Sequence, residues 1–326
     1  MAVLTYILFI IGFALLVKGA DFLVNGASAI ARRLKVSDLI IGLTIVAFGT
    51  SAPELIVNIF ASAQGNTQIA IGNVIGSNIF NIFLILGISA IIFPLLVTKS
   101  TVWKEIPFCL FATLLLGLLV NDNLFFQNSS ISGLSRIDAL IFILFFITFL
   151  FYVFRNVKKQ RKMDTNQLSL DIKKFSLGKS LFFIIFGLII LNIGAKWVVD
   201  GAVELALFFG VSQSLIGLTI VAAGTSLPEL ATSAVAAYKK KTDIAIGNIV
   251  GSNIFNILLI LGISAMIGPL PFSVESNIDI GVAILAPLLL FITMFTGRKK
   301  HLLERWEGVL FLLIYIIYIS FIIIRG

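Results

Sequence analysis

Apolar runs long enough to span a membrane recur along the whole chain, with short polar breaks between them. A spanning α-helix needs roughly 20 predominantly apolar residues, and grouping the runs between breaks predicts ten such helices. Their approximate ranges are 3–20, 38–61, 68–95, 103–120, 137–154, 178–199, 213–237, 243–267, 278–296 and 306–324. The one long polar stretch, residues 155–177, separates two sets of five.

Composition agrees with a membrane protein and excludes several other classes. Of 326 residues, 59% are hydrophobic and 12% are charged, with a mean hydropathy of +1.09, whereas soluble domains average about 45–50% apolar and about 25% charged residues. The single cysteine, Cys109, excludes a disulfide framework and is expected to face lipid. The N-terminal run lacks the basic start and cleavage site of a secretory signal, so we expect it to be retained. The pattern predicts an all-α polytopic membrane protein.

The two halves contain an internal duplication. A shift of 175 positions places residues 42–90 on residues 217–265 without a gap, with 33 identities in the 49 positions. The same register pairs Gly19 with Gly194 and Gly26 with Gly201. Because each half has an odd number of predicted helices, the second must enter the membrane in the opposite sense. This is the inverted-repeat plan of many secondary transporters, whose binding site lies near mid-membrane between the repeats.

The duplication divides the chain into three segments. Residues 1–154 are predicted to form the first five-helix repeat (motif 42–90), residues 155–177 a basic linker, and residues 178–326 the second repeat (motif 217–265). Cytoplasmic loops are enriched in Lys and Arg. If the linker is cytoplasmic, then 20 of the 24 Lys and Arg residues fall on cytoplasmic loops and helix ends. We therefore expect a multi-pass protein of the cell (inner or plasma) membrane, with both termini on the outer side.

Charged residues at the predicted helix ends have a simple interpretation. The lysine run 239–241 is most simply an anchor that fixes topology. Asp21, Asp200 and Glu204 either flank access paths or lie at the membrane interface, and the interface is favoured.

Two acidic residues are predicted deep inside spanning helices. Glu54 ends the segment GTSAPE at 49–54, and Glu229 ends GTSLPE at 224–229. A carboxylate at this depth is costly, and it is usually paired or functional. No Lys or Arg of helices 38–61, 68–95, 213–237 or 243–267 is placed at that depth. Since the glutamates occupy equivalent places in the repeats, we expect them to meet near the centre, where a metal cation supplies the missing charge.

Each glutamate follows a proline that is expected to open its helix. Pro53 and Pro228 have no N–H and clash with the carbonyl four residues earlier, so breaks are predicted near Gly49 and Gly224. Carbonyls freed by such breaks become good ligands where they line a cavity. We expect these carbonyls around Ala47, Thr50, Ala222 and Thr225.

Two polar stripes supply further oxygen. Each consists of residues spaced four apart, and hence on one helix face: Asn73, Ser77 and Asn81 in the first repeat, and Asn248, Ser252 and Asn256 in the second. Hard cations such as Ca²⁺ prefer oxygen ligands, about six to eight of them. The only histidine, His301, lies in a basic loop, so a zinc or copper site is not expected. Asn78 and Asn253 lie off the stripes and are expected to bond between helices.

These motifs resemble the paired alpha repeats of the sodium/calcium exchanger family, in the cation/calcium antiporter superfamily. The resemblance rests on the GTSxPE segments at 49–54 and 224–229 and on GNxxGSNxxN at 72–81 and 247–256. It covers the ten-helix plan and is closest to compact prokaryotic exchangers, because no large regulatory insert separates the halves. It implies a mid-membrane cluster of sites that holds either Ca²⁺ or several Na⁺. It also implies that the first and sixth helices slide past a rigid core.

The resemblance further implies roles for individual residues. The carboxylates shared by the calcium and sodium sites correspond to Glu54 and Glu229. Backbone-carbonyl ligands of calcium correspond to Thr50 and Thr225. The flanking sodium sites correspond to Ala47, Ser51 and Ser77, and to Ala222, Ser226 and Ser252. The remaining equatorial pair corresponds to Asn81 and Asn256. Some family members, including potassium-dependent ones, have Asp at one of these two positions, so the paired asparagines argue against K⁺ co-transport.

The function predicted is secondary active antiport of Na⁺ against Ca²⁺ by alternating access, without enzymatic activity. One rival is an antiporter of Ca²⁺ or another divalent cation against H⁺, which would neutralise the same two glutamates with protons. The other rival is a cation channel, against which the inverted duplication argues. No cofactor, nucleic acid or obligate protein partner is expected. The predicted partners are the transported Ca²⁺ and Na⁺ and the lipid bilayer.

Overall fold

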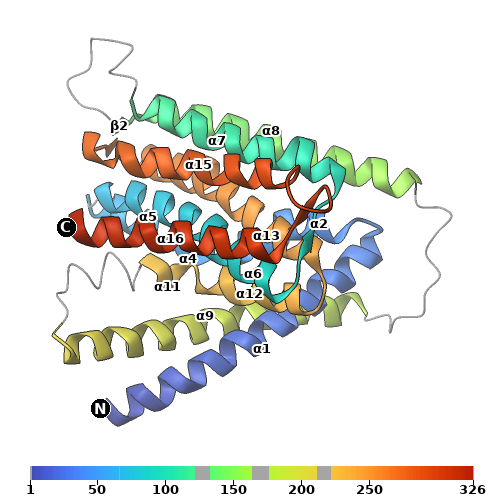
Figure 1. Cartoon of the computed structure of the whole chain (residues 1–326), viewed down its shortest axis with the longest axis horizontal. Coiled ribbons are helices and arrows are strands. Elements are labelled where there is room, and N and C mark those ends of the chain that lie inside the picture. The colour runs from blue at the N-terminus through green and yellow to red at the C-terminus, as the bar shows by residue number, and fades with distance from the viewer. Residues whose placement is uncertain (1, 66, 122–132, 164–175, 211–221, 326) are drawn as a thin grey trace.

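Helices that run along a common direction make up most of the computed structural model (Figure 1). It describes residues 2–65, 67–121, 133–163, 176–210 and 222–325. Helical structure satisfies each backbone N–H and C=O within its own segment, which an apolar surrounding requires. The start of α1 and the end of α16 lie at the same end of the bundle (Figure 1).

The described part of the first half contains eleven helical segments and two short strands. The helical segments are α1 (Ala2–Leu34), α2 (Asp38–Ile41), η1 (Gly42–Val46), α3 (Ala47–Thr50), α4 (Ala52–Ala63), α5 (Thr67–Ile79), η2 (Phe80–Leu86), α6 (Gly87–Ile92), η3 (Thr101–Glu105), α7 (Ile106–Leu119) and α8 (Arg136–Met163). The strands are β1 (Leu95–Leu96) and β2 (Gly133–Leu134).

The described part of the second half repeats this order. Its helices are α9 (Leu177–Phe208), α11 (Ala222–Thr225), α12 (Leu227–Tyr238), α13 (Thr242–Ile254), η7 (Phe255–Leu261), α14 (Gly262–Ile267), η8 (Val274–Ser276), α15 (Asn277–Thr293) and α16 (Arg305–Arg325). Two strands, β3 (Leu270–Pro271) and β4 (Leu302–Leu303), pair antiparallel with β2 and β1 respectively. The sequence did not predict these strands, because two residues are too few to give an alternating pattern.

Most of the predicted spans are present as apolar helices. Within the described residues, seven helices are long and apolar enough to cross a membrane. An eighth span results if the pair Asp38–Thr50 and Ala52–Ala63, bent by 45°, is counted as one. α15 is apolar but shorter, at 17 residues, and the helix predicted over 213–237 begins outside the described residues. A polytopic all-helical fold is therefore confirmed, and the count of ten stays a prediction.

Three helices are longer than their apolar runs. α1 has 33 residues and α9 has 32, where helices over 3–20 and 178–199 were expected. α8 continues to Met163, into the segment predicted as a linker. The added residues of α8 are rich in Lys, Arg and Gln, which are good helix formers, so this polar stretch ends an apolar run without ending the helix. The predicted runs of α1 and α9 stop just before Asp21 and Asp200, where a single charged residue interrupts the apolar run but the helix continues.

Glycines hold α1 and α9 in backbone contact. Gly12, Gly19 and Gly26 are spaced seven apart on α1, and Gly187, Gly194 and Gly201 repeat that spacing on α9. A Cβ at Gly19 would lie 2.9 Å from the carbonyl oxygen of Gly187, and a Cβ at Gly194 would lie 2.9 Å from that of Gly12. Only glycine permits so close an approach, as in small-residue packing of membrane helices. The 175-residue shift relates the two sets of glycines, so the contact is itself duplicated.

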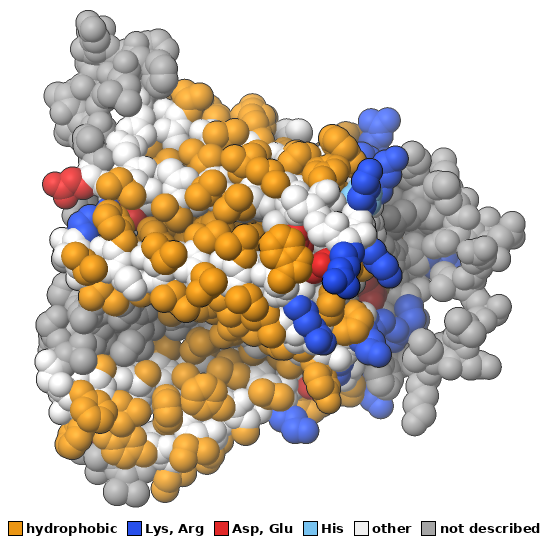
Figure 2. Space-filling view, in the orientation of Figure 1, with side chains coloured by type: hydrophobic (Ala, Val, Ile, Leu, Met, Phe, Trp, Pro, Cys, Tyr) orange, Lys and Arg blue, Asp and Glu red, His pale blue; other side chains and the backbone are white. Residues whose placement is uncertain are grey.

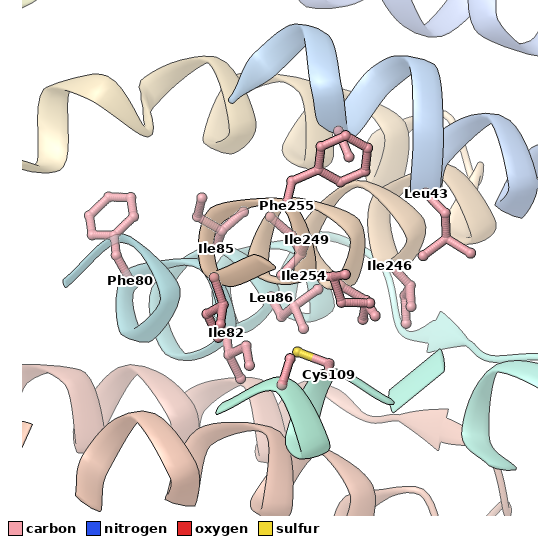
Figure 3. Close-up of a cluster of buried hydrophobic side chains, with 14 of the residues drawn as sticks. Leu43, Phe80, Ile82, Ile85, Leu86, Cys109, Ile246, Ile249, Ile254 and Phe255 are labelled. Carbon is pink, nitrogen blue, oxygen red and sulfur yellow. The ribbon is translucent and has the colours of Figure 1, made fainter. Parts of the chain in front are cut away.

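Two helical stretches form the interior of the bundle. In the apolar stretches of Ala70–Ile92 and Thr242–Ile267, 72% and 83% of residues are buried, against 22–39% for the other five long spans of the described chain. Their side chains form much of the buried cluster in Figure 3. Cys109 lies in this cluster at 1% exposure (Figure 3). The expectation that it faces lipid was therefore wrong, since its helix turns this side toward the centre.

Both interior stretches change from α- to π-helix at equivalent residues. The π segments are η2 and η7, each seven residues long, and the 175-residue shift relates them. A π turn widens the helix and is common at functional sites. Asn81 and Asn256 are the second residues of these segments. The widened turns therefore begin where the predicted ligand asparagines are.

Charge is concentrated at one end of the molecule. Figure 2 shows Lys and Arg side chains gathered at the end opposite the two termini, while the flank between the ends is apolar. We refer to the end where these Lys and Arg side chains gather as the basic end. Its position agrees with the charge asymmetry predicted for the loops.

Candidate ion-binding site

The helices that carry the two glutamates are both interrupted just before the proline. α3 ends at Thr50 and α4 begins at Ala52, with Ser51 at φ −82°, ψ 6°. In the second half Ser226 has φ −91°, ψ 6° between α11 and α12. The predicted breaks are confirmed, two residues later than the glycines. Each proline lies at the start of the following helix, where its missing N–H is not needed.

The two breaks bring Glu54 and Glu229 into one buried centre. Each glutamate is 1% exposed. The Ser226 hydroxyl donates to Glu54 Oε1 at 2.9 Å, and the Ser51 hydroxyl donates to Glu229 Oε1 at 2.9 Å. Ser252 adds a longer bond to Glu229 Oε1, at 3.4 Å. The serine of each repeat therefore holds the carboxylate of the other.

Each carboxylate keeps a second oxygen without a partner. Glu54 Oε2 and Glu229 Oε2 are buried and accept no hydrogen bond from the described residues. The ion pairs of the described chain involve other acids, namely Asp21, Asp38, Asp200 and Asp279. A buried carboxylate oxygen left unpaired is strongly unfavourable, so these two oxygens are candidates for binding a cation.

Amide and hydroxyl oxygens from the two polar stripes lie in the same interior. Asn81 and Asn256 are 1% and 0% exposed, and the Oδ1 atom of each is buried without a hydrogen-bond partner in the described chain. The hydroxyl of Ser77 is in the same condition. Within the described residues, no group of three or more His, Cys, Asp or Glu could hold a metal ion. A cation here would therefore be bound by two carboxylates together with neutral oxygens, as Ca²⁺ and Na⁺ permit.

Thr50 and Ala47 already have hydrogen-bond partners that the sequence did not predict. The Thr50 hydroxyl donates to Asn248 Oδ1 at 3.0 Å and lies 3.4 Å from the Ala47 carbonyl oxygen. The Ala47 carbonyl also accepts the Ser51 N–H at 3.0 Å, so it is not fully freed by the break. Thr225 ends α11, which begins at Ala222. Residues 211–221 and the side chain of Ala222 lie outside the described residues.

Sequence reasoning missed a second layer of polar residues one turn beyond the glutamates. Asn58 donates to the backbone oxygen of Glu54 at 2.8 Å. In the other repeat, the equivalent Ser233 accepts the side-chain N–H of Asn248 at 3.0 Å. Both residues are fully buried. Their spacing of four from each glutamate was a usable signal, because such residues share a helix face.

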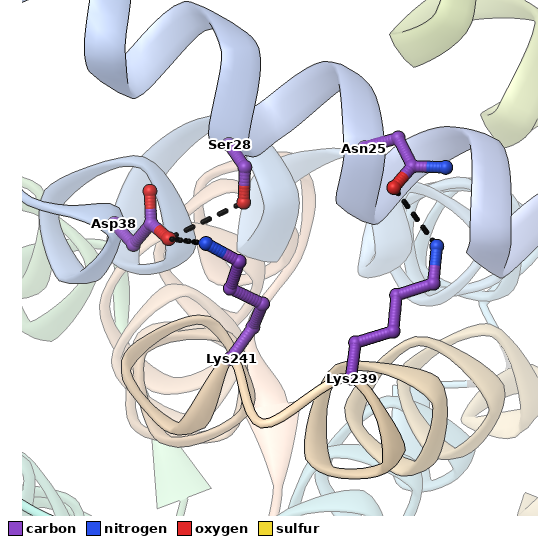
Figure 4. A network of polar contacts seen from close by, with 5 residues as sticks. All are labelled: Asn25, Ser28, Asp38, Lys239 and Lys241. Carbon is purple, nitrogen blue, oxygen red and sulfur yellow. Dashed lines mark hydrogen bonds and ion pairs between the residues drawn. The ribbon is translucent and has the colours of Figure 1, made fainter. Parts of the chain in front are cut away.

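Lysines at the basic end bind α1 to the rest of the bundle. Lys239 Nζ lies 2.5 Å from Asp21 Oδ1 and 2.8 Å from Asn25 Oδ1. Lys241 Nζ lies 3.3 Å from Asp38, which also accepts the Ser28 hydroxyl at 3.2 Å (Figure 4). We call these six residues the α1–lysine network. The lysine run is therefore an interhelical contact as well as a charged loop.

Comparisons with known proteins identify the family of this chain. The sequence model of the family described as sodium/calcium exchanger protein matches residues 4–155 and 179–324. The chain is 33% identical over 350 residues to the sodium/calcium exchanger MaX1 of Methanosarcina acetivorans, covering 98% of each chain. It is 38% identical over 313 residues to the putative antiporter CaxA of Alkalimonas amylolytica, covering 95% of each.

Solved structures give the same result. The chain resembles the sodium-calcium exchanger NCX_Mj soaked with 10 mM Na⁺ and zero Ca²⁺, with a TM-score of 0.82 and 36% identity over 98% of this chain and 99% of the other. Structures of that exchanger soaked with Sr²⁺ match similarly, one with a TM-score of 0.80. Both structural matches cover 98% of this chain. This chain therefore belongs to the sodium/calcium exchanger family.

Proposed function

We propose that this protein is a secondary active antiporter that exchanges Na⁺ for Ca²⁺ at the Glu54–Glu229 centre. The carrying observation is that the serine of each repeat binds the glutamate of the other, which leaves one buried oxygen of each carboxylate unpartnered. Unpaired buried charges are unfavourable until a cation neutralises them. The similarity to the sodium/calcium exchanger MaX1 and to the putative antiporter CaxA supports the same interpretation.

Charge balance gives a reason for coupled transport. Two carboxylates match the charge of one Ca²⁺, and several Na⁺ would supply a comparable charge. An empty centre would have to carry two unpaired carboxylates through the bundle as the accessible side changes, and this should be prohibitive. Only the loaded centre changes sides, so one cation leaves when the other enters. This alternation is the exchange reaction.

We assign the predicted ligands to overlapping sites in this centre. The carboxylates serve both cations, Thr50 and Thr225 contribute to the calcium site, and Asn81 and Asn256 form the remaining equatorial pair. The flanking sodium sites use Ala47, Ser51 and Ser77, and Ala222, Ser226 and Ser252. The buried and unpartnered oxygens of Ser77, Asn81 and Asn256 support these assignments.

The membrane arrangement belongs to the same proposal. We infer ten spanning helices in two inverted repeats, residues 1–154 and 178–326, joined by a cytoplasmic segment at 155–177. The basic end would then face the cytoplasm, and both termini would lie outside the plasma membrane. The gathering of Lys and Arg side chains at one end of the molecule (Figure 2) supports this orientation.

Uptake of ⁴⁵Ca²⁺ into proteoliposomes tests the proposal. Vesicles loaded with Na⁺ are diluted into sodium-free buffer, and a pH gradient is applied in a separate series. We expect uptake that requires internal Na⁺ and ignores the pH gradient. Uptake driven by the pH gradient alone would make the protein a calcium/proton antiporter that uses the same two glutamates. If neither the Na⁺ gradient nor the pH gradient drives uptake, calcium is not an ion that this protein exchanges.

A further inference from the structure

Asn78 and Asn253 form a reciprocal pair between the two interior helices. They occupy equivalent positions in the repeats and are 3% and 2% exposed. The side-chain amide of Asn78 donates to the backbone oxygen of Asn253 at 3.3 Å, and that of Asn253 donates to the backbone oxygen of Asn78 at 3.2 Å. The expectation that these residues bond between helices is therefore confirmed.

This pairing fixes which end of each side-chain amide is available to bond a third residue. A backbone carbonyl can only accept, so the NH₂ group of each paired asparagine must face it and the Oδ1 atom must face elsewhere. Asn253 Oδ1 accepts the NH₂ group of Asn81 at 2.9 Å, and Asn78 Oδ1 accepts that of Asn256 at 3.0 Å. The orientation of all four amides thus follows from two backbone carbonyls.

The consequence for Asn81 and Asn256 is chemical. Their NH₂ groups are engaged, and their Oδ1 atoms are buried and unpartnered in the described chain. If either amide turned over, it would direct a donor where an oxygen now lies, and a donor repels a cation. The side-chain oxygen is useful as a ligand only while its amide stays in this orientation.

We propose that Asn78 and Asn253 are positioning residues that hold Asn256 and Asn81, respectively, with oxygen toward the transported cation. The inference rests on the proposed ion site. The connection is crossed: Asn253 on α13 orients Asn81 of η2, and Asn78 on α5 orients Asn256 of η7. Each repeat therefore sets the ligand geometry of the other, and both asparagine ligands depend on contact between the interior helices.

Equilibrium binding of ⁴⁵Ca²⁺ and ²²Na⁺ to the purified full chain in detergent tests this role without transport. Asn253→Ala and Asn78→Ala are measured alone and combined with Asn81→Ala or Asn256→Ala. Removing a residue that orients a metal ligand typically weakens binding about 10- to 100-fold, and we expect a loss in this range for each single variant. Thermal melting reports whether each variant is folded.

The pattern among double variants decides the assignment. We expect Asn253→Ala to add nothing to Asn81→Ala but to add its full loss to Asn256→Ala, with the opposite pattern for Asn78→Ala. A merely structural role has no reason to follow this crossed pattern. Losses that add in all four combinations would overturn the assignment.

Two further variants control for general damage to the interior. Asn121→Ala removes a comparable bond between asparagines, from Asn121 to Asn277 at 2.7 Å, and is expected to leave binding unchanged. Asn253→Asp keeps an acceptor for Asn81 but loses the donor to the Asn78 backbone oxygen, so it should weaken Ca²⁺ binding less than Asn81→Ala does; a loss as large as that of Asn81→Ala would contradict the role of that acceptor. This variant keeps the test open if Asn253→Ala does not fold.

The result is separable from the proposed function. The crossed pattern without sodium-driven uptake would support the positioning role and overturn the exchange reaction. Exchange by the wild type with fully additive losses would do the reverse. A wild-type protein that binds neither cation would overturn both.

Discussion

At the centre of the bundle the two repeats contribute matching residues: a serine from each binds the other's glutamate, and an asparagine from each orients the other's ligand. At the helix ends they differ. Asp21 and Asn25 of α1 are hydrogen-bonded to each other at 3.1 Å and both also bind Lys239. Their equivalents on α9, Lys196 and Asp200, bind each other at 2.9 Å with exposed side chains.

This difference separates two requirements on the fold. In the proposed exchange each cation needs oxygens from both repeats, and this requirement would keep the residues of the centre duplicated. The contacts of α1 and α9 with the rest of the bundle carry no such requirement, so they have diverged. The duplication therefore explains the site, while the differences between the repeats distinguish the two ends of the molecule.

The largest expected effect comes from removing one charge at the shared centre. Glu54→Gln and Glu229→Gln should each reduce exchange to background, because one carboxylate no longer balances the cation. Equal loss in the two variants would support a symmetric centre. Uptake assays should be paired with thermal melting, and the exposed Asp200→Asn serves as the charge-matched control. Substantial exchange by either glutamine variant would contradict the proposed centre.

The glycine contact between α1 and α9 should be equally sensitive from both sides. In Gly19→Leu and Gly194→Leu the new side chain clashes with the backbone of the partner helix. Its Cβ atom alone would lie 2.9 Å from a backbone carbonyl oxygen of that helix. Overpacking of this kind costs about 1–3 kcal/mol, and we expect values in the upper part of that range. Thermal melting in detergent measures the loss. Gly178→Ala, whose Cβ would meet nothing within 4 Å, should not destabilise the protein.

One buried serine in each repeat, Ser62 and Ser233, allows a comparison of a hydroxyl without a partner and a hydrogen-bonded one. Ser233→Ala leaves the amide of Asn248 without its 3.0 Å acceptor, which should cost about 1–2 kcal/mol in stability. Ser62 is also buried, but its hydroxyl has no partner among the described residues, so Ser62→Ala should change stability by less than about 0.5 kcal/mol. Equal melting temperatures for the two variants would contradict this distinction.

The smallest expected effect is in the α1–lysine network. Lys239→Gln removes partly exposed contacts to Asp21 and Asn25 and should lower stability by less than about 1 kcal/mol. The loss should diminish at high salt, where exposed charges are screened. Lys196→Gln, on the equivalent side of α9, should have no measurable effect. Equal melting temperatures for the two variants at low salt would contradict the expected difference in stability between the α1 contacts of Lys239 and the α9 contact of Lys196.

Much of the fold was predictable because its causes are local. Apolar runs located most of the helices, and Pro53 and Pro228 located the breaks to within two residues, since a missing N–H acts on its own helix. The full lengths of α1, α8 and α9 were not predictable from hydropathy, because a helix can continue through the polar residues that end an apolar run. The burial of Cys109 depends on which side of α7 faces the interior, and a lone apolar residue does not encode that.

The candidate site was predictable in its residues but less so in its connections. The duplication identified Glu54, Glu229 and the two polar stripes. It did not show that Ser226 binds Glu54, or that Asn253 orients Asn81, because those contacts join residues 172 positions apart. The π segments that carry Asn81 and Asn256 depend on packing between helices and have no simple sequence signal.

A crystal of this protein soaked with Ca²⁺ or Sr²⁺ tests the central claim most directly, since it locates the cation independently of transport. We predict a single strong peak between Glu54 and Glu229, about 2.3–2.6 Å from carboxylate oxygens for Ca²⁺, which Na⁺ added in excess would displace. A cation bound elsewhere, or a peak at this centre that Na⁺ does not reduce, would contradict it.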